Sequence, residues 1–221
     1  MSRLAAAWAA AALLLAGAGA AVAQPAPGAV EIRSEPPAEE PLTWEFSASA
    51  FGYIVPEDRD YGSATVTADR GIWHLEARYN YEGLDTGSFW AGANFAFGKT
   101  VAFEVTPMVG GVVGHTHGVA PGYHLTVRWK RLELYSEGEY LFDTTHSDDS
   151  FFYSWNELTY APFEWLQAGL VSQRTRAYQT PLDVQRGILI RGFVKNWTAG
   201  FYVFNFGWTD PTFVFSLGLD F

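Results

Sequence analysis

Cysteine is absent from all 221 residues, and its absence removes several classes of protein together. Disulfide frameworks, thiolate metal sites and lipid attachment through an N-terminal cysteine all require a thiol. After residue 23 the chain also lacks any run near the ~18 consecutive apolar residues that a membrane-spanning helix needs. Basic residues are scarce, with 14 Lys and Arg against 24 Asp and Glu, which excludes the positive surface of a nucleic-acid-binding protein.

Aromatic residues, by contrast, are abundant and make up 17% of the chain, with 9 Trp, 11 Tyr and 17 Phe. Hydrophobic residues of all kinds reach 48%, although no long apolar run holds them. They must therefore alternate with polar residues, and such alternation is typical of β-strands. Roughly 200 residues remain after the N-terminal segment, which is most simply one domain.

The N-terminal segment has the three parts of a secretory signal peptide. Arg3 supplies the positive charge, residues 4–20 are apolar and rich in Ala and Leu, and residues 21–23 give a small-x-small cleavage pattern. We expect a signal peptide over residues 1–23, cleaved after Ala23, and export through the inner membrane. A permanent helical anchor is the weaker alternative, because the apolar stretch is short and a Pro-rich segment follows it at once.

Residues 24–41 form a separate region with five prolines, four glutamates and almost no aromatic content. This composition predicts an extended, disordered periplasmic lead-in. A flexible tail is the simpler interpretation, and a plug that folds back into the remainder of the chain is the alternative.

From residue 42 to residue 221, apolar and polar residues alternate in repeated segments. The pattern is clearest over residues 72–82, where Trp73, Leu75, Ala77, Tyr79 and Tyr81 point one way and the polar residues between them point the other. The expected strands are 42–51, 63–68, 72–82, 88–97, 101–113, 122–130, 132–142, 151–160, 165–173, 186–194, 198–207 and 212–221. Most approach the ~9–11 residues that a tilted strand needs to cross a membrane. Twelve strands are preferred, and ten are the alternative because 63–68 is short.

The connections between these segments fall into two interleaved sets. Tight turns occupy 69–71, 98–100, 130–131, 161–164 and 195–196, and longer polar loops occupy 55–62, 83–87, 114–121, 143–150 and 174–185. This order predicts an up-and-down barrel with short periplasmic turns, longer outside loops and an even strand count. Tryptophans lie beside the tight turns (Trp73, Trp129, Trp165, Trp197), and other aromatics lie near the loops (Tyr53, Tyr81, Tyr123, Tyr140, Phe142). Two such belts are typical of the two membrane interfaces.

The last nine residues carry the most specific signal. Five apolar side chains share one face at period two and end on an aromatic residue: Phe213, Phe215, Leu217, Leu219 and Phe221. This ending resembles the C-terminal strand by which bacterial outer-membrane β-barrel proteins are recognised for assembly. The resemblance is to that broad, porin-like class. It implies location in the outer membrane, contact with lipid, and recognition by the barrel-assembly machinery and periplasmic chaperones, but no activity. A soluble sandwich that ends in a buried strand is the competing interpretation.

If the aromatic-rich face meets lipid, the other face lines the lumen. The charged lumen residues are then expected to be Glu45, His74, Glu76, Arg78, Glu104, His124, Arg128, Glu133, Glu137, Glu139, Glu157 and Arg191. Carboxylates outnumber cations in this set, so some need water or bound cations as partners. A water-filled passage is one interpretation, and a packed network of salt bridges is the other, because twelve strands lie between filled and open barrels.

Known catalytic motifs mostly do not fit this sequence. Lipid-hydrolysing outer-membrane barrels resemble serine esterases with a His and a Ser two apart on a strand, and no His-x-Ser pair occurs here. The run His146-Ser147-Asp148-Asp149 has suitable residue types but lies in a predicted solvated loop, and an omptin-like protease pattern is not matched. His115 and His117 are two apart and resemble half of a divalent metal site, although a polar loop is the simpler interpretation.

The sequence therefore predicts an all-β, single-domain, up-and-down transmembrane β-barrel over residues 42–221, without a cofactor. The function expected is a small porin-like channel with an acidic lumen that weakly prefers cations. The alternatives are a non-conducting structural barrel and, less well supported, a lipid-modifying hydrolase.

Overall fold

The computed structural model describes residues 43–56, 59–145, 149–177, 183–207 and 210–221. The predicted signal peptide and the lead-in over 24–41 lie outside these residues, as do three members of the His146–Asp149 run, residues 146–148. No helix in the described part of the chain is long and apolar enough to cross a membrane.

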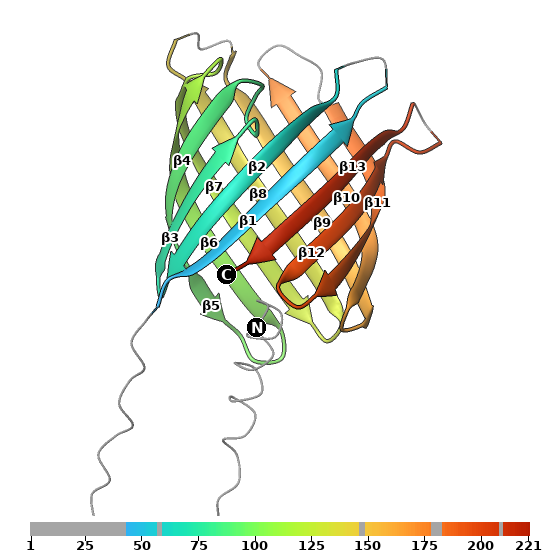
Figure 1. Cartoon of the computed structure of the whole chain (residues 1–221). Coiled ribbons are helices and arrows are strands. Elements are labelled where there is room, and N and C mark those ends of the chain that lie inside the picture. Colours follow the sequence, from blue (N-terminus) through green and yellow to red (C-terminus); the bar gives the residue numbers. More distant parts are fainter. Residues whose placement is uncertain (1–42, 57–58, 146–148, 178–182, 208–209) are drawn as a thin grey trace, which may run out of the picture.

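The described residues form one antiparallel sheet that closes on itself (Figure 1). Its strands are β1 (Glu45–Ile54), β2 (Tyr61–Arg70), β3 (Trp73–Tyr79), β4 (Thr86–Ala93), β5 (Phe95–Phe97), β6 (Ala102–Gly114), β7 (Gly118–Trp129), β8 (Leu132–Asp143), β9 (Phe151–Phe163), β10 (Leu166–Ala177), β11 (Asp183–Val194), β12 (Trp197–Phe204) and β13 (Thr212–Asp220). β4 and β5 both pair with β6, so they are two segments of one strand of the barrel wall. The barrel therefore has twelve strands. The prediction of a twelve-stranded up-and-down barrel is confirmed.

The barrel has two rims. The terminal rim is where β1 begins and β13 ends, and it carries the turns at 71–72, 98–101, 130–131, 164–165 and 195–196. The loop rim is the opposite one, where β1 ends at Ile54. The four tryptophans predicted beside the tight turns, Trp73, Trp129, Trp165 and Trp197, are all exposed at the terminal rim.

The alternation of the sequence becomes the two faces of the wall. Large apolar side chains such as Leu75, Phe89, Leu170 and Ile188 are exposed on the outside, while their polar neighbours face the lumen. On β13, Phe215 and Leu217 are exposed on the outside, whereas Val214, next to Phe215, is fully buried on the inward face. An apolar outer wall with every backbone group paired in a closed ladder is what the hydrocarbon core demands.

The barrel closes along the seam between β1 and β13, where Ser47 pairs with Asp220 and Ile54 with Phe213. Phe46 and Phe221 extend this ladder by two further backbone hydrogen bonds, at 3.0 and 2.9 Å. The last residue of the chain is therefore part of the wall.

Some strand boundaries differ from prediction for identifiable reasons. β7 begins at Gly118, so the loop expected over 114–121 shrinks to residues 115–117. The inward residues here, Gly118 and Ala120, are small and buried, and their size conceals the alternation from the sequence. β4 is separated from β5 at Asn94, whose side chain bonds Asp69 Oδ1 at 2.8 Å and Thr106 Oγ1 at 2.6 Å.

The outer wall also carries a series of hydrogen-bonded polar side chains that the sequence did not predict. Tyr123, expected in the belt near the loops, lies half-buried over Gly138 with its hydroxyl 3.1 Å from Ser136 Oγ. Ser136 donates in turn to Asn156 Oδ1 at 2.7 Å. These bonds satisfy side chains that would otherwise face lipid unpaired.

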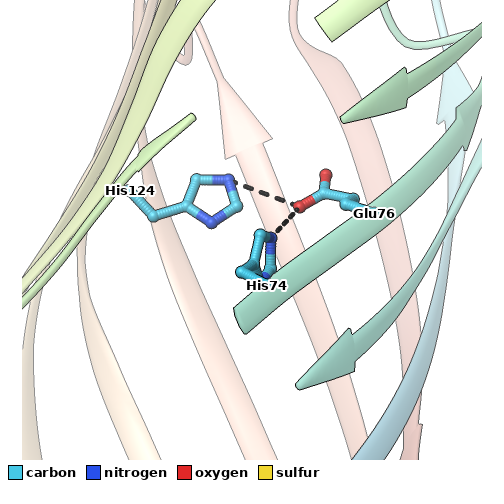
Figure 2. Close-up of side chains that lie close together, drawn as sticks. All are labelled: His74, Glu76 and His124. Carbon is cyan, nitrogen blue, oxygen red and sulfur yellow. Dashed lines mark hydrogen bonds and ion pairs between the residues drawn. The ribbon is translucent and has the colours of Figure 1, made fainter. Parts of the chain in front are cut away.

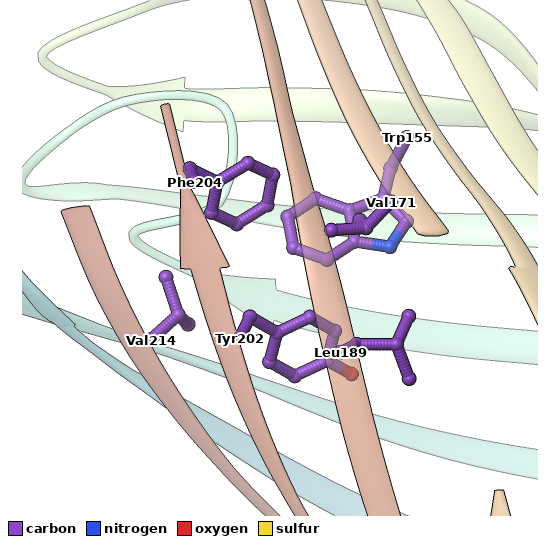
Figure 3. Close-up of a cluster of buried hydrophobic side chains, with 6 residues drawn as sticks. All are labelled: Trp155, Val171, Leu189, Tyr202, Phe204 and Val214. Atoms are coloured by element: carbon purple, nitrogen blue, oxygen red, sulfur yellow. The ribbon is translucent and has the colours of Figure 1, made fainter. Parts of the chain in front are cut away.

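Apolar side chains also pack inside the barrel. One cluster, the aromatic cluster, consists of Trp155, Val171, Leu189, Tyr202, Phe204 and Val214, and Figure 3 shows these side chains gathered from neighbouring strands. A second cluster on another part of the inner wall consists of Trp90, Met108, Val112, Ala120 and Leu141. The lumen is therefore partly filled, which the predicted polar interior did not include.

Candidate functional site in the barrel lumen

The charged residues expected in the lumen make three groups of contacts, and Glu45 lies apart from them. His74, Glu76, Arg78, His124, Glu137 and Glu139 form one central network, Arg128 holds Glu104 and Glu133, and Arg191 holds Glu157. Glu45 is exposed at the terminal rim, at the inward-facing position opposite Asp69.

Residues 80–85 leave the wall between β3 and β4 and bring side chains into the lumen. Asn80 and Asp85 both have a φ of 53°, and Asn80 Oδ1 accepts from the backbone of Asp85 at 2.8 Å, which closes a compact turn. Tyr81 donates a hydrogen bond to Glu137, and Glu82 is buried beside Ser88. The prediction that Tyr81 belongs to the outer belt is wrong. β3 ends at Tyr79, and the turn that follows points the Tyr81 side chain into the lumen.

Tyr53 also lies inside, against the aromatic cluster, although the sequence placed it in the outer belt. It shares the inward face of β1 with Phe51, and the period-two pattern of β1 carries an aromatic pair to the lumen at the loop rim.

Arg78 is the centre of the central network. Its guanidinium contacts Glu76, donates to Glu139 Oε2 at 2.7 Å, and lies 3.6 Å from Glu82 Oε1. It also lies over two rings, 4.3 Å from the centroid of Tyr81 and 4.4 Å from that of Trp90. Planar guanidinium groups suit such sites, because they bind carboxylates at the edge and aromatic rings at the face.

Two glycines make room for the ring beneath Arg78. A Cβ atom at Gly110 would lie 2.3 Å from the Trp90 ring, and one at Gly122 would lie 3.0 Å from it. The indole therefore rests directly on the backbones of β6 and β7, and its Nε1 atom donates to Ser88 Oγ at 2.9 Å.

On the terminal-rim side of Arg78, two histidines converge on one carboxylate, as Figure 2 shows. His74 Nε2 lies 3.1 Å and His124 Nε2 lies 3.8 Å from Glu76 Oε2. The opposite nitrogen of His74, Nδ1, bonds Asp69 Oδ1 at 2.7 Å. His74 and Glu76 are buried, whereas the His124 side chain retains 20% exposure to the lumen.

Glu137 completes this side of the network. Its Oε2 atom lies 3.6 Å from His124 Nε2, and its two oxygens accept hydrogen bonds from the hydroxyls of Tyr81 and Tyr135. Side chains from β3, β7 and β8 thus meet across the lumen.

The charges of the central network do not balance. Over the described residues its contacts join five carboxyl groups (Asp69, Glu76, Glu82, Glu137, Glu139) to one guanidinium, with two histidines between them. Two buried carboxylate oxygens, Glu82 Oε2 and Glu139 Oε1, have no hydrogen-bond partner within the described residues. Such groups favour a bound cation.

The two other arginines bind their carboxylates away from this centre. Arg128 donates to Glu104 at 2.6 Å and to Glu133 at 2.7 Å near the terminal rim. Arg191 contacts Glu157 and donates to the Tyr202 hydroxyl at 3.0 Å. Arg191 and Tyr202 also line an inward pocket of ≈ 270 Å³ that includes Thr198, Ser216 and Asp220.

Besides Tyr81 and Glu82, sequence reasoning missed Asp69, Tyr135 and Trp90, which belong to or support the central network. Asp69 was placed in a turn, but β2 continues to Arg70 and keeps Asp69 in step with the inward Ser63. Tyr135 and Trp90 have aromatic side chains on the inward face, where the alternation rule predicts polar ones. Strand register was the available signal for Asp69. Asp69 on β2 pairs with His74 on β3, so the two side chains share the inward face.

The histidine pair considered for metal binding at the loop rim gains no support. His115 and His117 are both exposed in the short turn between β6 and β7, and they belong to no metal-type cluster within the described ranges. The only such cluster found there is His74, Glu76 and His124.

A closed twelve-stranded barrel with an apolar outer wall and a charged, partly filled lumen defines a porin-like outer-membrane β-barrel protein. No family model and no curated protein matches the sequence. The fold is similar to that of the KdgM porin, with a TM-score of 0.54 and 11% identity over 79% of this chain and 98% of that one. A structure described as the KdgM porin in complex with disordered oligogalacturonate matches with a TM-score of 0.52, 11% identity and the same coverage. At this identity the similarity concerns the fold.

Proposed function

We propose that this protein is an outer-membrane channel that passes small solutes and prefers cations. The observation that carries this proposal is the central network, where carboxyl groups outnumber guanidinium groups five to one in the middle of a closed barrel. Negative charge within low-dielectric walls attracts cations and repels anions. The porin-like fold supports the same conclusion at the level of architecture.

The narrowest part of the passage is proposed to be formed by residues 80–85 and the network that they join. Tyr81 crosses to Glu137 on β8, and Glu82 and Glu139 both approach Arg78 on β3. These contacts connect separate walls, so they limit the size of a solute. Small hydrated cations fit such a passage better than large sugars.

The sign of the charge also separates this lumen from one suited to acidic sugars. One similar structure is described as a complex with oligogalacturonate, whose units carry carboxylates. The carboxyl groups of the central network would repel such a ligand. An acidic oligosaccharide is therefore a poor solute for this lumen.

The route to the membrane belongs to the same proposal. Residues 1–23 direct export through the inner membrane, and the apolar face of β13 is the signal read by periplasmic chaperones and the barrel-assembly machinery. The exposure of Phe215, Leu217 and Phe221 supports recognition of this face.

A non-conducting structural barrel is the second candidate, and the interior packing favours it. Phe204, Val214 and Leu141 are completely buried although they face the lumen. If side chains close the whole cross-section, the central network holds strands together and passes nothing. A lipid-modifying hydrolase has no comparable support, because no serine is bonded to a histidine in the described part of the chain.

Conductance of the refolded chain in a planar bilayer decides between these candidates. In a KCl gradient we expect stepwise currents and a reversal potential of the sign that denotes cation preference. Glu104→Gln, at a half-exposed position, should reduce that potential without affecting folding. Silent membranes containing folded barrel would establish the structural role, and anion preference would contradict the proposed selectivity.

A further inference from the structure

The two histidines of the central network and the carboxylate between them have the composition of a transition-metal site. His74, Glu76 and His124 each offer one ligand atom, and these atoms all lie within 4.8 Å of one another. Imidazole and carboxylate groups are the ligands that Zn²⁺ takes most often when thiolates are absent. We propose that the barrel lumen binds one Zn²⁺ ion between His74, Glu76 and His124.

The distances are close to those that a metal requires. Ligand atoms about 2.0–2.2 Å from a tetrahedral zinc ion lie about 3.3–3.6 Å from one another. Here Glu76 Oε2 lies 3.1 Å from His74 Nε2 and 3.8 Å from His124 Nε2. Glu137 Oε2, 3.6 Å from His124 Nε2, is placed to supply a fourth ligand. Small side-chain rotations suffice to bring these atoms around one ion.

The surroundings of His74 select the nitrogen that would bind. Asp69 Oδ1 lies 2.7 Å from Nδ1, so a neutral imidazole that donates its hydrogen from Nδ1 to Asp69 presents the lone pair of Nε2 to a metal ion. A carboxylate that orients a histidine in this manner is the usual second partner of a metal-binding imidazole. Nε2 then faces Glu76 Oε2 at 3.1 Å, and two acceptors at that distance need a proton or a metal ion between them.

The negative charge around the two histidines favours a divalent cation. Arg78 occupies the other oxygen of Glu76 and is itself bound by Glu139, so its positive charge is already offset. Asp69, Glu82 and Glu137 leave further negative charge around the two histidines. The ion has access, because the side chains of His124 and Glu137 are 20% and 16% exposed to the lumen.

The proposed site does not depend on whether the barrel conducts. In a conducting barrel, a metal at this position would lie in the passage beside Tyr81 and reduce the current. In a silent barrel, it would join β3 to β7 and stabilise the fold. Binding is therefore measured directly and not through transport.

The test is calorimetric titration of the refolded full chain in detergent with ZnCl₂. We expect one ion per barrel, at least a tenfold loss of affinity in His124→Gln, and a 10–100-fold loss in the positioning variant Asp69→Asn. The matched control is His115→Gln/His117→Gln, which removes the exposed histidine pair at the loop rim and should leave binding unchanged. Excess MgCl₂ should not compete, because Mg²⁺ binds oxygen ligands.

Folding of each variant is verified by heat-modifiable mobility on a gel. Absence of stoichiometric Zn²⁺ binding by the folded wild-type chain would overturn the site. So would binding that survives His124→Gln and disappears in the His115/His117 control. If a variant at Asp69 fails to fold, the more exposed His124→Gln still decides the outcome. A channel that proves silent leaves this result intact.

Discussion

Phe46 and Phe221 join the two ends of the barrel wall, with ring centroids 5.9 Å apart and an interplanar angle of 16°. The same residues exchange two backbone hydrogen bonds, from Phe46 N at 3.0 Å and from Phe221 N at 2.9 Å. The final residue therefore contributes to closure as well as to the apolar outer face.

This pairing predicts a large difference between two neighbouring substitutions. Phe221→Asp removes a ring stack worth about 0.5–1.5 kcal/mol and places a charge on the exposed outer face. Asp220→Asn changes only an inward side chain near the rim. We expect impaired folding and insertion in the first variant and nearly normal behaviour in the second, measured by heat-modifiable mobility. Equal behaviour of the two would remove the assembly role of Phe221.

The two faces of the wall should differ in their tolerance of charge. Leu217 is exposed on the outside of β13, whereas Thr198, paired with the adjacent Gly218, lines the inward pocket. Leu217→Arg should cost up to about 2–4 kcal/mol, the value for a lipid-facing Arg near the midplane, and Thr198→Arg much less. Urea unfolding in lipid vesicles measures both. A similar cost at both positions would contradict the outward orientation of Leu217.

Glu139 and Glu104 were both predicted to be lumen residues, but they differ in burial. Glu139 is 4% exposed and bonds Arg78 at 2.7 Å, whereas the Glu104 side chain is 46% exposed. Glu139→Gln weakens a buried charged hydrogen bond and should cost about 1.5–3 kcal/mol. Glu104→Gln should cost less than about 1 kcal/mol, because exposed ion pairs contribute little. Chemical unfolding curves in detergent test this order, and its reversal would mean that the lumen around Glu139 is solvated.

The position of the Trp90 ring predicts that substitutions at two adjacent glycines have different effects on stability. A Cβ at Gly110 would clash with the indole ring, but a Cβ at Gly111 meets nothing within 4 Å. Gly110→Leu should destabilise the barrel by about 1–3 kcal/mol through overpacking. Gly111→Leu, which adds an apolar side chain to the outer wall, serves as the control. Thermal unfolding compares them, and tolerance of Gly110→Leu would show that the Trp90 ring is not held against the wall.

The turn at residues 80–85 yields a prediction about conduction. Tyr81 crosses the lumen and donates to Glu137. Tyr81→Ala should therefore increase single-channel conductance, whereas Tyr81→Phe, which keeps the ring, should leave it close to wild type. Unchanged conductance in Tyr81→Ala would place the narrowest point of the passage elsewhere.

Alternation alone predicted the architecture correctly because a two-sided wall repeats with period two. The outward register of β3, β8 and β13, the tryptophans at the terminal rim and the inward charges all follow from that period. The prediction failed where the backbone departs from the period-two alternation of a regular strand. Asn80 takes a positive φ and turns Tyr81 inward, and Asn94 separates β4 from β5.

The interior packing was not predictable in the same manner. Trp155 and Tyr202 are aromatic residues on inward faces, and the preference of aromatic residues for lipid places them outside. What holds them inside is contact between strands distant in sequence, such as the edge-to-face packing of Trp155 against Phe51 at 6.2 Å. Likewise, the sequence identified His74, Glu76 and His124 as lumen residues but gave no sign that β3 and β7 bring them together.

The seam between β1 and β13 has a consequence for the order of folding. Elsewhere in the described sheet, each strand pairs with its neighbours along the chain or, at β4 and β6, skips only the short β5. Those pairings need only short loops to close, whereas the seam needs the two ends of the barrel sequence to meet, which carries the largest entropy of loop closure. The seam should therefore form last, and until it forms β1 and β13 remain two unpaired edges. Until that final step the sheet is open, and its two edges carry unpaired backbone groups that hydrocarbon does not satisfy.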